Sequence, residues 1–317
     1  MIRYVVLSLA ALTAAPDIGA SQPSRTQVVM LGTGTPIPDP DRAGPALAIV
    51  VDSVAYLFDA GAGVGRRAAA ASIKGMKALA PRTPNGQPSP RFDRVFLTHL
   101  HSDHTLGLAD AIFTPWIQGR VQPIDIYGPP GTQRLVSGIL DGNADDIAER
   151  LHASGGPSPT GWKAIIHEIS DGEIFRDSRI SVSAFAVPHA DWKYAFGYRI
   201  TTPNGIIVIS GDTRLSDVIA KQCRECDILI HEVYSDSGYA NLPALRKTYH
   251  AHAHTSATQL GDIAALARPK LLILDHQLFF GASEEKLLAE VRSRFSGRVV
   301  SAHDLDIFTL PIEVPGG

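Results

Sequence analysis

Three histidines and one aspartate lie within six positions of one another, directly after an apolar run of the kind that forms a buried strand. The stretch reads Thr98-His99-Leu100-His101-Ser102-Asp103-His104. His99 and His101 are two positions apart, so in an extended backbone their side chains project to the same side and can bind one metal ion. Asp103 and His104 follow after the chain has turned, and they can face a second ion. We therefore predict a two-metal site, in preference to a histidine-rich surface loop.

Three further candidate ligands follow other segments of strand-like composition. They are His189 after residues 181–187, Asp212 after 206–210, and His276 after 271–275. Each alone has an ordinary explanation, as a loop histidine, a turn former or a strand-end imidazole. Because strand ends at one sheet edge converge on one cleft, these side chains and the first motif together would complete two metal sites. A carboxylate such as Asp212 can bridge two cations and help hold them ~3.5–4 Å apart around one shared water.

Length and composition fit one soluble enzyme domain. The chain has 317 residues, of which 44% are hydrophobic, and this is enough for one large core. The formal net charge of −3 offers no general attraction to nucleic acid. Beyond the N-terminal region, no segment approaches the ~18 uninterrupted apolar residues of a membrane helix, so we expect no membrane partner.

The N-terminus has the pattern of an export signal. Arg3 supplies a positive start, and Val5–Ala15 is apolar but short for a membrane span. Ile18-Gly19-Ala20 before Ser21 fits a cleavage site, and no nearby cysteine points to a lipoprotein. We predict a signal peptide at residues 1–20, a hydrolase domain at 21–317, and a periplasmic or secreted protein. The alternative is a buried N-terminal strand or helix.

Cys223 and Cys226 form a C-x-x-C pair. A redox or zinc-ribbon role would need a thioredoxin-like context or a second pair, and the sequence has neither. We therefore expect a structural role, either as a small-loop disulfide in an oxidising compartment or as buried thiols.

Apolar periodicity predicts strands and helices in two successive halves. In the first half we expect strands at 27–31, 46–51 and 55–58, and helices at 64–79, 106–117 and 135–151. In the second half we expect strands at 180–187, 196–201, 206–210, 227–231, 271–274, 298–301 and 305–310, and helices at 255–267 and 283–295. Two β-rich halves with helices outside them predict an α/β fold with two central sheets covered on both outer faces.

The chain resembles the metallo-β-lactamase superfamily, and within it the ribonuclease Z-like branch, over nearly all of residues 21–317. The metal-binding pattern is the most specific match, and it comprises His99, His101, Asp103, His104, His189, Asp212 and His276. Matches to the branch are Leu31-Gly32-Thr33-Gly34 with Arg42, Leu57-Phe58-Asp59-Ala60-Gly61, Glu232 with His254, and Ala302-His303-Asp304. The resemblance implies a four-layer αββα sandwich with the active site in the cleft between the two halves.

The resemblance also implies how the ligands divide and which residues move protons. One zinc ion would be held by His99, His101 and His189, the other by Asp103, His104 and His276, with Asp212 as the bridge. The two ions would lower the pKa of a shared water, and Asp103 would orient that water or accept its proton. His254, polarised by Glu232, would protonate the leaving oxygen. Mn²⁺ or iron fits the same imidazole and carboxylate ligands.

Two departures from the branch argue against a tRNA substrate. Ribonuclease Z carries a long flexible arm that grips tRNA, and in its familiar bacterial form the arm lies between the positions that match His189 and Asp212. Here the interval 190–211 is a short strand hairpin. The segment 277–280, after His276, also lacks the family's arginine that would hold a phosphate. We expect a small-molecule ester and no tRNA, and the sequence leaves a homodimer open.

Three classes of function remain open. The leading hypothesis is an exported binuclear zinc hydrolase that acts on a phosphodiester or a related small ester, including an arylsulfate. The second is a lactonase or a β-lactamase-type hydrolase. The bridging Asp212 argues against a β-lactamase but not against a lactonase, whereas the Glu232–His254 pair favours phosphodiester chemistry. The third is a non-catalytic metal-binding module, which a complete ligand set disfavours. Other side chains that could border the site are Tyr194, His231, Tyr234, His250, His252, Phe279, Phe280 and His303.

Overall fold

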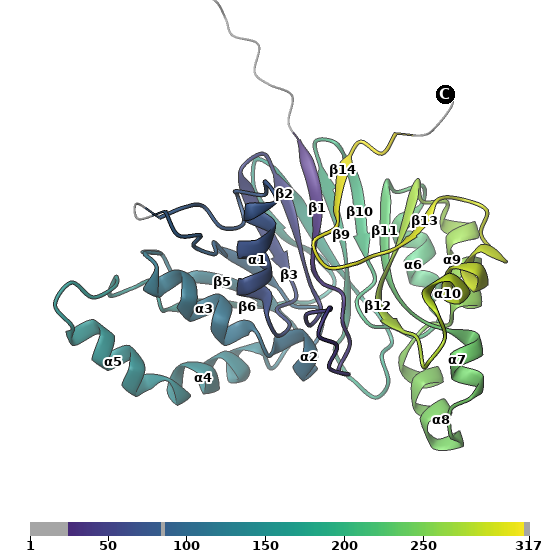
Figure 1. Cartoon of the computed structure of the whole chain (residues 1–317), viewed down its shortest axis with the longest axis horizontal. Coiled ribbons are helices and arrows are strands. Elements are labelled where there is room, and N and C mark those ends of the chain that lie inside the picture. The colour runs from purple at the N-terminus through teal and green to yellow at the C-terminus, as the bar shows by residue number, and fades with distance from the viewer. Residues whose placement is uncertain (1–24, 84–85, 314–317) are drawn as a thin grey trace, which may run out of the picture.

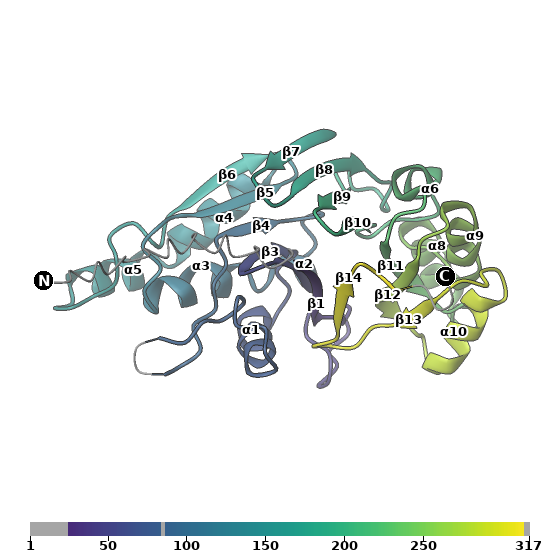
Figure 2. The same ribbon diagram turned by 90° about the horizontal axis from the view of Figure 1, so that it is seen from above.

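Two seven-stranded sheets lie face to face in residues 25–83 and 86–313, the part of the chain that the computed structural model describes. Helices cover the outer face of each sheet, so the layers follow the order helix, sheet, sheet, helix (Figure 1 and Figure 2). The last strand of the chain, β14, returns to the first sheet and pairs with β1. The predicted αββα sandwich is therefore confirmed.

The first sheet has the strand order β14-β1-β2-β3-β4-β5-β6, antiparallel from β14 to β3 and parallel from β3 to β6. Its strands are β1 (Thr26–Gly32), β2 (Ala46–Val51), β3 (Val54–Phe58), β4 (Arg94–Phe96), β5 (Ile124–Gly128), β6 (Ala164–Glu168) and β14 (Ile307–Leu310).

The second sheet has the order β13-β12-β11-β10-β9-β8-β7, parallel from β13 to β10 and antiparallel from β10 to β7. Its strands are β7 (Gly172–Arg176), β8 (Ser181–Ala186), β9 (Phe196–Thr202), β10 (Gly205–Ile209), β11 (Ile228–Tyr234), β12 (Leu271–Leu278) and β13 (Val299–Ser301). Each sheet thus has a parallel part whose strands end at a common edge, where side chains can converge.

The helices divide between the two sheets. The first sheet carries α1 (Val64–Ile73), α2 (Ser102–Thr105), α3 (Leu108–Ile117), α4 (Thr132–Gly142) and α5 (Ala144–His152). The second sheet carries α6 (Asp217–Cys223), α7 (Asp236–Ala240), α8 (Ala244–Ala253), α9 (Ala257–Ala267) and α10 (Glu284–Arg292).

Alternation along the strands explains how each sheet is buried on both faces. In β4, Phe96 packs between the two sheets, whereas Val95 packs under the helices. Phe96 stacks on Phe58 with ring centroids 4.9 Å apart, in the core that joins the sheets. The outer cores lie beneath the helices, with Trp116 of α3 over the first sheet and Leu260 of α9 over the second. Burial on both faces accounts for the nearly continuous apolar strands in the sequence.

All five predicted helices have other bounds in the structure, since α9 begins at Ala257 and α10 spans Glu284–Arg292. Helix α1 ends at Ile73, well before the predicted end at residue 79, because Gly75 turns the chain with a φ of 109° that glycine adopts freely. The predicted helix 106–117 corresponds to α3, which the short helix α2 precedes. The predicted helix 135–151 is two helices, α4 and α5, and Asn143 both ends the first and begins the second.

Helix α8 is absent from the sequence prediction. Its first half, Ala-Leu-Arg-Lys, favours a helix by intrinsic propensity. Only His250 and Ala253 of this helix are buried, so the core-facing apolar stripe that would announce it is missing. Strands β5, β6 and β7 were also not predicted.

The predicted signal at residues 1–20 lies outside the described residues. Within the described ranges, no helix is long and apolar enough to cross a membrane. Cys223 and Cys226 form a disulfide between the end of α6 and the start of β11, and both are fully buried. Of the two alternatives left open by the sequence, the structure has the small-loop disulfide.

Candidate active site

The first ligand motif lies at the carboxyl end of β4 and runs into α2. His99 and His101 stand in the extended segment before α2, whereas Asp103 and His104 are in its single turn. The backbone N–H of Ala60 donates to His104 O over 2.9 Å, which fixes this turn against the end of β3. The turn after α2 packs so closely on the same segment that a Cβ atom at Gly107 would lie 2.1 Å from Gly61 O. Glycine at position 107 therefore lets the motif reach its place.

The other ligands come from the second sheet. His189 follows β8 and Asp212 follows β10, as predicted. His276 was expected after its strand, but it lies inside β12 at a bulge, where the register with β11 shifts between Glu232 and Val233. Its φ of 43° is in the left-handed region, which residues other than glycine rarely adopt. The bulge re-aims the imidazole toward the other ligands.

The structure brings the seven predicted ligands into two adjoining groups. The first group is His99, His101, His189 and Asp212, whose ligand atoms all lie within 4.8 Å of one another. His101 Nδ1 lies 2.9 Å from His99 Nε2 and 3.1 Å from His189 Nε2. The second group is Asp103, His104 and His276, with Asp103 Oδ2 3.5 Å from His104 Nε2 and 3.2 Å from His276 Nε2.

Asp212 lies between the two groups. Its Oδ2 is 4.0 Å from His99 Nε2 and 3.6 Å from His276 Nε2, and its Oδ1 is 3.5 Å from His104 Nε2. The carboxylate is almost fully buried, so its charge acts at short range on both groups. This is the geometry expected of a carboxylate that bridges two cations.

Hydrogen bonds on the far side of the imidazoles hold the rings and leave one nitrogen of each for a metal. His104 Nδ1 is 2.8 Å from Asp59 Oδ2, and His189 Nδ1 donates to Ala253 O over 2.7 Å. Asp59 is itself fixed by the backbone N–H and hydroxyl of Thr98. His104 Nε2 is buried and has no hydrogen-bond partner among the described residues. An orphaned nitrogen beside two carboxylates fits a metal ligand.

The electrostatics of the two groups differ. Burial lowers the pKa of the imidazoles in the first group: His99, His101 (to about 4) and His189. These rings are therefore neutral, which is the form that binds metals. In the second group burial opposes protonation of His276, but the Asp212 charge together with the hydrogen bond and charge of Asp103 outweighs it and raises the pKa of His276 to about 9. The carboxylates of Asp103 and Asp212 therefore stabilise a positive charge beside them, and a metal ion can supply that charge in place of protons.

The predicted proton-donor pair borders the second group. Glu232 Oε2 lies 3.3 Å from His254 Nδ1, and both side chains are buried. The other Glu232 oxygen accepts a 2.8 Å hydrogen bond from the backbone N–H of Thr255. His254 is the C-cap residue that directly follows α8, whereas the sequence placed it directly before a helix starting at Thr255. The following helix, α9, begins at Ala257. Burial raises the pKa of Glu232 to about 8 and lowers the pKa of His254 to about 4.

A cavity of about 480 Å³ opens beside the ligands. It is lined by Pro36, Ile37, His101, Ser102, Asp103, Asp212, Leu245, Arg246, Tyr249, His250, His254, His276 and Leu278. A neighbouring hollow of about 360 Å³ shares His101 and Tyr249 with it and is bordered by Trp192. Sequence analysis missed Leu245, Arg246 and Tyr249 because α8 was not predicted.

The remaining sequence candidates divide by position. His250 is buried on the cavity wall, whereas His252 is exposed and pairs with Asp191 at 3.2 Å. His231 is buried beside the pair, and His303 is an exposed partner of Glu284. Tyr234 stacks on Tyr239, Phe279 lies under the Arg42 guanidinium, Phe280 packs on His250, and Tyr194 is partly exposed beside Lys193. Of these eight candidates, His250 alone lines the 480 Å³ cavity.

The loop that carries Ile37 is tied to the end of β12. Arg42 Nη1 donates to Gln277 Oε1 over 2.5 Å, to Ala302 O over 3.1 Å and to Thr33 Oγ1 over 2.9 Å. The Gln277 side chain in turn donates to Ser301 Oγ over 2.9 Å. These hydrogen bonds occupy the Arg42 guanidinium, which therefore holds one rim of the cavity in place.

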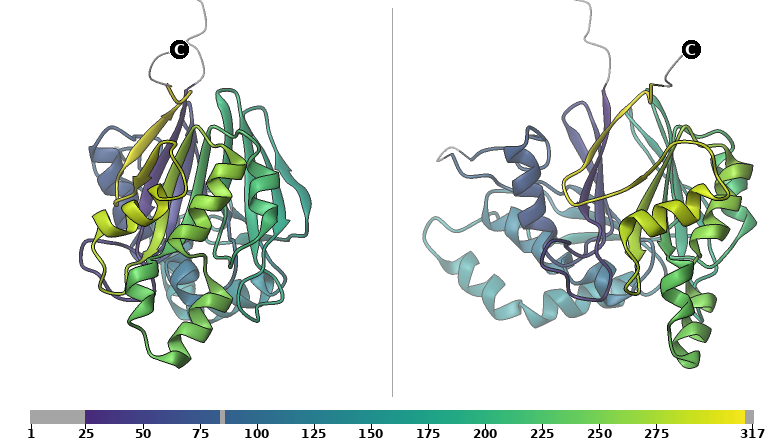
Figure 3. Two further views of the ribbon diagram at one scale, coloured as in Figure 1. Left: turned by 90° about the vertical axis from the view of Figure 1, so that its right-hand side faces the viewer. Right: turned by 45° about the vertical axis from the view of Figure 1, so that its right-hand side comes forward.

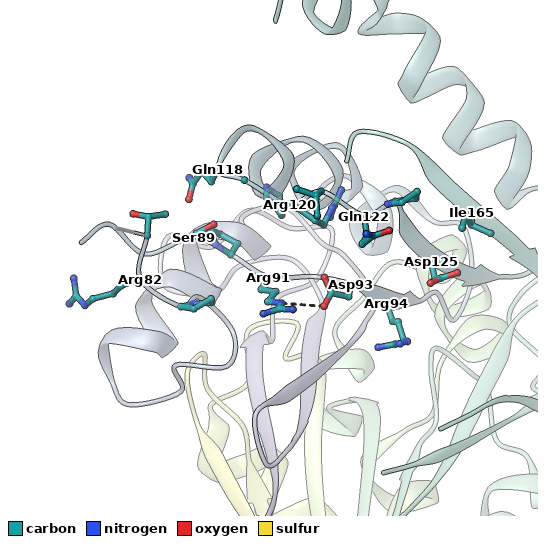
Figure 4. Close-up of a pocket in the computed structure, with 17 residues that line it drawn as sticks. Arg82, Ser89, Arg91, Asp93, Arg94, Gln118, Arg120, Gln122, Asp125 and Ile165 are labelled. Atoms are coloured by element: carbon teal, nitrogen blue, oxygen red, sulfur yellow. Dashed lines mark hydrogen bonds and ion pairs between the residues drawn. The ribbon is translucent and has the colours of Figure 1, made fainter. Parts of the chain in front are cut away.

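A larger cavity, of about 640 Å³, lies elsewhere, at the opposite ends of β4 and β5. Several arginines line it, and Figure 4 shows Arg91 paired with Asp93. Arg120 donates to the backbone carbonyls of Phe92, Ile112 and Gly161. These guanidinium groups are occupied by the protein itself, and none of the metal-ligand clusters of the described residues adjoins this cavity.

Comparisons with known proteins agree with this fold and site. The Beta-lactamase superfamily domain matches residues 55–277. A ribonuclease Z of Mycobacterium bovis is 30% identical over 285 residues, covering 88% of this chain and 96% of the relative. The structure of the short form of human tRNase Z has a TM-score of 0.63 at 23% identity, covering 90% of this chain and 100% of that one. The metallo-β-lactamase fold protein YhfI from Bacillus subtilis also has a TM-score of 0.63, at 19% identity, covering 90% and 99%.

The chain belongs to the metallo-β-lactamase superfamily and, within it, to the ribonuclease Z-like branch. It is accordingly a metal-dependent hydrolase, in agreement with the prediction from the sequence.

Proposed function

We propose that this chain is an exported hydrolase that uses two zinc ions to cleave a phosphodiester or a related small ester, including an arylsulfate. The observation that carries the proposal is the place of Asp212, whose Oδ1 lies 3.5 Å from His104 Nε2 and whose Oδ2 lies 3.9 Å from His189 Nε2. A carboxylate shared between two ligand groups suits a pair of ions. When bound, that pair would supply Lewis acidity and an activated water.

The side chains around the ligand groups would move the protons. Asp103 lines the cavity and would orient the attacking water or accept its proton. His254 borders the same cavity and would donate a proton to the leaving oxygen. Glu232 would act through His254, because the Glu232 carboxylate accepts a hydrogen bond from the N–H of Thr255 and faces the His254 imidazole. The chemistry is general acid–base catalysis beside a cationic centre.

Zinc is the ion that we propose, because the ligand set contains five imidazoles and two carboxylates. Mn²⁺ or iron would fit the same donors, so the ion bound in the cell depends on supply as well as affinity. Hydrogen bonds fix Nδ1 of His104 and of His189, so both rings keep the orientation that leaves Nε2 free to bind a metal.

Two features support a small substrate rather than a tRNA. The interval between His189 and Asp212 contains a short loop and the hairpin of β9 and β10, with no extended arm in it. The net charge of −3 also gives no general attraction to a phosphate backbone. Because the curated relatives are named ribonuclease Z, a precursor tRNA is the comparison substrate that any test must include.

Two features support export to the periplasm or the medium. One is the N-terminal pattern of Arg3 followed by the apolar residues 5–15. The other is the Cys223–Cys226 disulfide, because disulfides persist mainly in oxidising compartments.

A substrate panel on the zinc-loaded protein tests the proposal. The panel contains bis-p-nitrophenyl phosphate, p-nitrophenyl sulfate, an acyl-homoserine lactone, nitrocefin and a 3′-extended precursor tRNA. We expect chelator-sensitive turnover of the phosphodiester or the sulfate, and at most weak turnover of the rest. Preferred turnover of the lactone or the tRNA would replace this proposal with a lactonase or a tRNA-processing function. No turnover of any member would favour a metal-binding module.

A further inference from the structure

Helix α8 stands beside the metal cleft with one side turned toward it. In Figure 1, α7 and α8 extend beyond the sheets at the end of the molecule where α2 lies, and α8 projects from the body in both views of Figure 3. Leu245, Arg246, Tyr249 and His250 line the 480 Å³ cavity. Their spacing of i, i+1, i+4 and i+5 places them on one side of the helix. This side, the cleft face of α8, is defined by these four residues.

The cleft face and the opposite rim both carry exposed apolar side chains. Leu245 is 84% exposed, Tyr249 48%, and Ile37 on the facing loop 57%. Isolated exposed apolar side chains are common, but these three border one cavity together with Leu278 and Pro36. Such a lining fits the apolar part of a bound molecule, because the contact would remove these side chains from water.

Arg246 adds a single cation to this apolar lining. Among the described residues that line the cavity, it is the one arginine or lysine. No hydrogen bond or ion pair engages its guanidinium within the described parts of the chain. The lining carboxylates, Asp103 and Asp212, both belong to the ligand groups. The guanidinium is therefore available to a ligand, with donors arranged for a carboxylate, sulfonate or phosphate group.

The adjacent Lys247 shows the contrasting arrangement. Its Nζ donates to Ala240 O over 2.6 Å, and its charge lies over the Tyr239 ring at 5.9 Å from the centroid. This lysine fastens α8 to α7 and does not line the cavity. Neighbouring cations on one helix thus have separate roles, and Lys247 offers a matched control for Arg246.

We propose that the cleft face of α8 determines substrate specificity, and that it takes an ester whose retained part is an apolar group ending in an anion. Leu245, Tyr249 and Ile37 hold the apolar group, and Arg246 binds the anion. This inference rests on the proposed function, since it takes the bound molecule to be the ester that is cleaved. It also explains how a site without the arginine of the family's final loop can still bind an acidic substrate.

Binding of unreactive probes tests the surface apart from catalysis. The probes are biphenyl-4-sulfonate, whose sulfonate is a weak metal ligand, and its neutral analogue 4-methylsulfonylbiphenyl, each titrated into zinc-loaded protein by calorimetry. We expect the sulfonate to bind more tightly, and Arg246→Ala to weaken it by about tenfold, as loss of a charge-assisted hydrogen bond should. The sulfone should change by less than about twofold. Leu245→Ser should weaken the binding of both probes. Lys247→Met should not weaken binding of the sulfonate more than binding of the sulfone.

Kinetics then connect the surface to turnover. Two p-nitrophenyl phosphodiesters are compared, one with a phenyl and one with a 4-carboxyphenyl second ester group. We expect wild-type kcat/KM to favour the carboxylated diester and Arg246→Ala to abolish that preference, with Arg246→Lys restoring part of it. An equal effect of Arg246→Ala on both probes and both diesters would overturn the inference while leaving the proposed function intact. Arg246-dependent binding without turnover of any panel ester would instead refute the proposed function.

Discussion

Glu232 Oε2 lies 3.3 Å from His254 Nδ1, and the two side chains reach each other from different elements. Glu232 is in β11, whereas His254 is the C-cap residue directly after α8. Because Glu232 also accepts a hydrogen bond from the N–H of Thr255, the place of the imidazole depends on the carboxylate and on the end of α8 together. We therefore expect the pair to act as one unit in protonation of the leaving group.

Replacement of His254 by alanine should lower the rate by ~10²–10⁴-fold for an ester with an alkyl leaving group, while metal content is retained. The loss should be much smaller for a p-nitrophenyl leaving group, because such a group departs without a proton. Steady-state rates for both esters of the same acid, together with metal analysis, measure this. His252→Ala is the matched control, since His252 is exposed and pairs with Asp191. An equal loss for both esters would make His254 a positioning or metal-binding residue.

Purified protein should contain about two zinc-like ions per chain, as two ligand groups with a shared carboxylate require. Asp212→Ala should lose metal and activity together for every ester, because Asp212 faces both groups. Elemental analysis before and after reconstitution measures the content. A wild-type protein that holds only trace metal after growth with added zinc, and gains none on reconstitution, would contradict the two-ion site.

Asp59→Asn should weaken metal binding by about 10–100-fold without unfolding the protein, because Asp59 fixes the ring of His104 through Nδ1. Competition with a chelating dye measures the affinity. Asp52→Asn is a suitable control: Asp52 and Asp59 share a φ of 56°, but Asp52 is exposed at the turn between β2 and β3. Unchanged zinc affinity in Asp59→Asn would mean that Asp59 serves the fold alone.

Stability at acid pH should depend on a bond between the sheets. The Tyr56 hydroxyl donates to Asp177 Oδ2 over 2.6 Å. Burial opposes ionisation of Asp177, but hydrogen bonds from Tyr56 and from the backbone of Ile180 and Arg179 outweigh it and lower its pKa. A lowered folded-state pKa stabilises the fold above the unfolded value of ~3.9, and the contribution is lost as pH falls through the folded value.

Tyr56→Phe should therefore reduce the free energy of unfolding by about 1 kcal/mol at neutral pH, since Asp177 is partly solvated. The difference from wild type should shrink as the pH falls below ~4, where Asp177 becomes protonated in both states. Urea unfolding at several pH values checks this. A pH-independent difference would show that lost packing of the tyrosine hydroxyl, and not the charged bond, is responsible.

Export and the disulfide make a joint prediction. Protein from the native host should begin near Ser21 and should contain no free thiol, because Cys223 and Cys226 are the only cysteines of the chain. N-terminal sequencing and thiol titration under denaturing conditions decide both points. An intact Met1 in a cytoplasmic fraction with two titratable thiols would contradict export.

The four layers and the ligand positions could be predicted because they depend on local patterns. The strands that precede the ligands are short apolar runs, and six of the seven ligands come directly from the ends of such runs or from the motif at 99–104. His276 shows the limit of this reasoning. Its placement inside β12 depends on a bulge whose register is set by β11, which the sequence of β12 alone does not specify.

Helix α8 was missed for a different reason. Periodicity reveals a helix when its apolar residues face a core, but Leu245 and Tyr249 face the cavity and remain exposed. The role of Asp59 was also not assigned, because its partner His104 is distant in sequence and the contact exists only once β3 and β4 pair. Features that serve the site rather than the core are thus the ones that pattern analysis passes over.

The bulge in β12 couples two parts of the molecule that otherwise look independent. The extra residue at His276 shifts the register of the following residues of β12 by one, so that Gln277 pairs with Val233 and its side chain accepts a hydrogen bond from Arg42, in the loop that carries Ile37. A single-residue deletion there would at once turn a ligand away from the cleft and release one wall of the substrate cavity. Metal affinity and the shape of that wall therefore depend on the same single residue of β12.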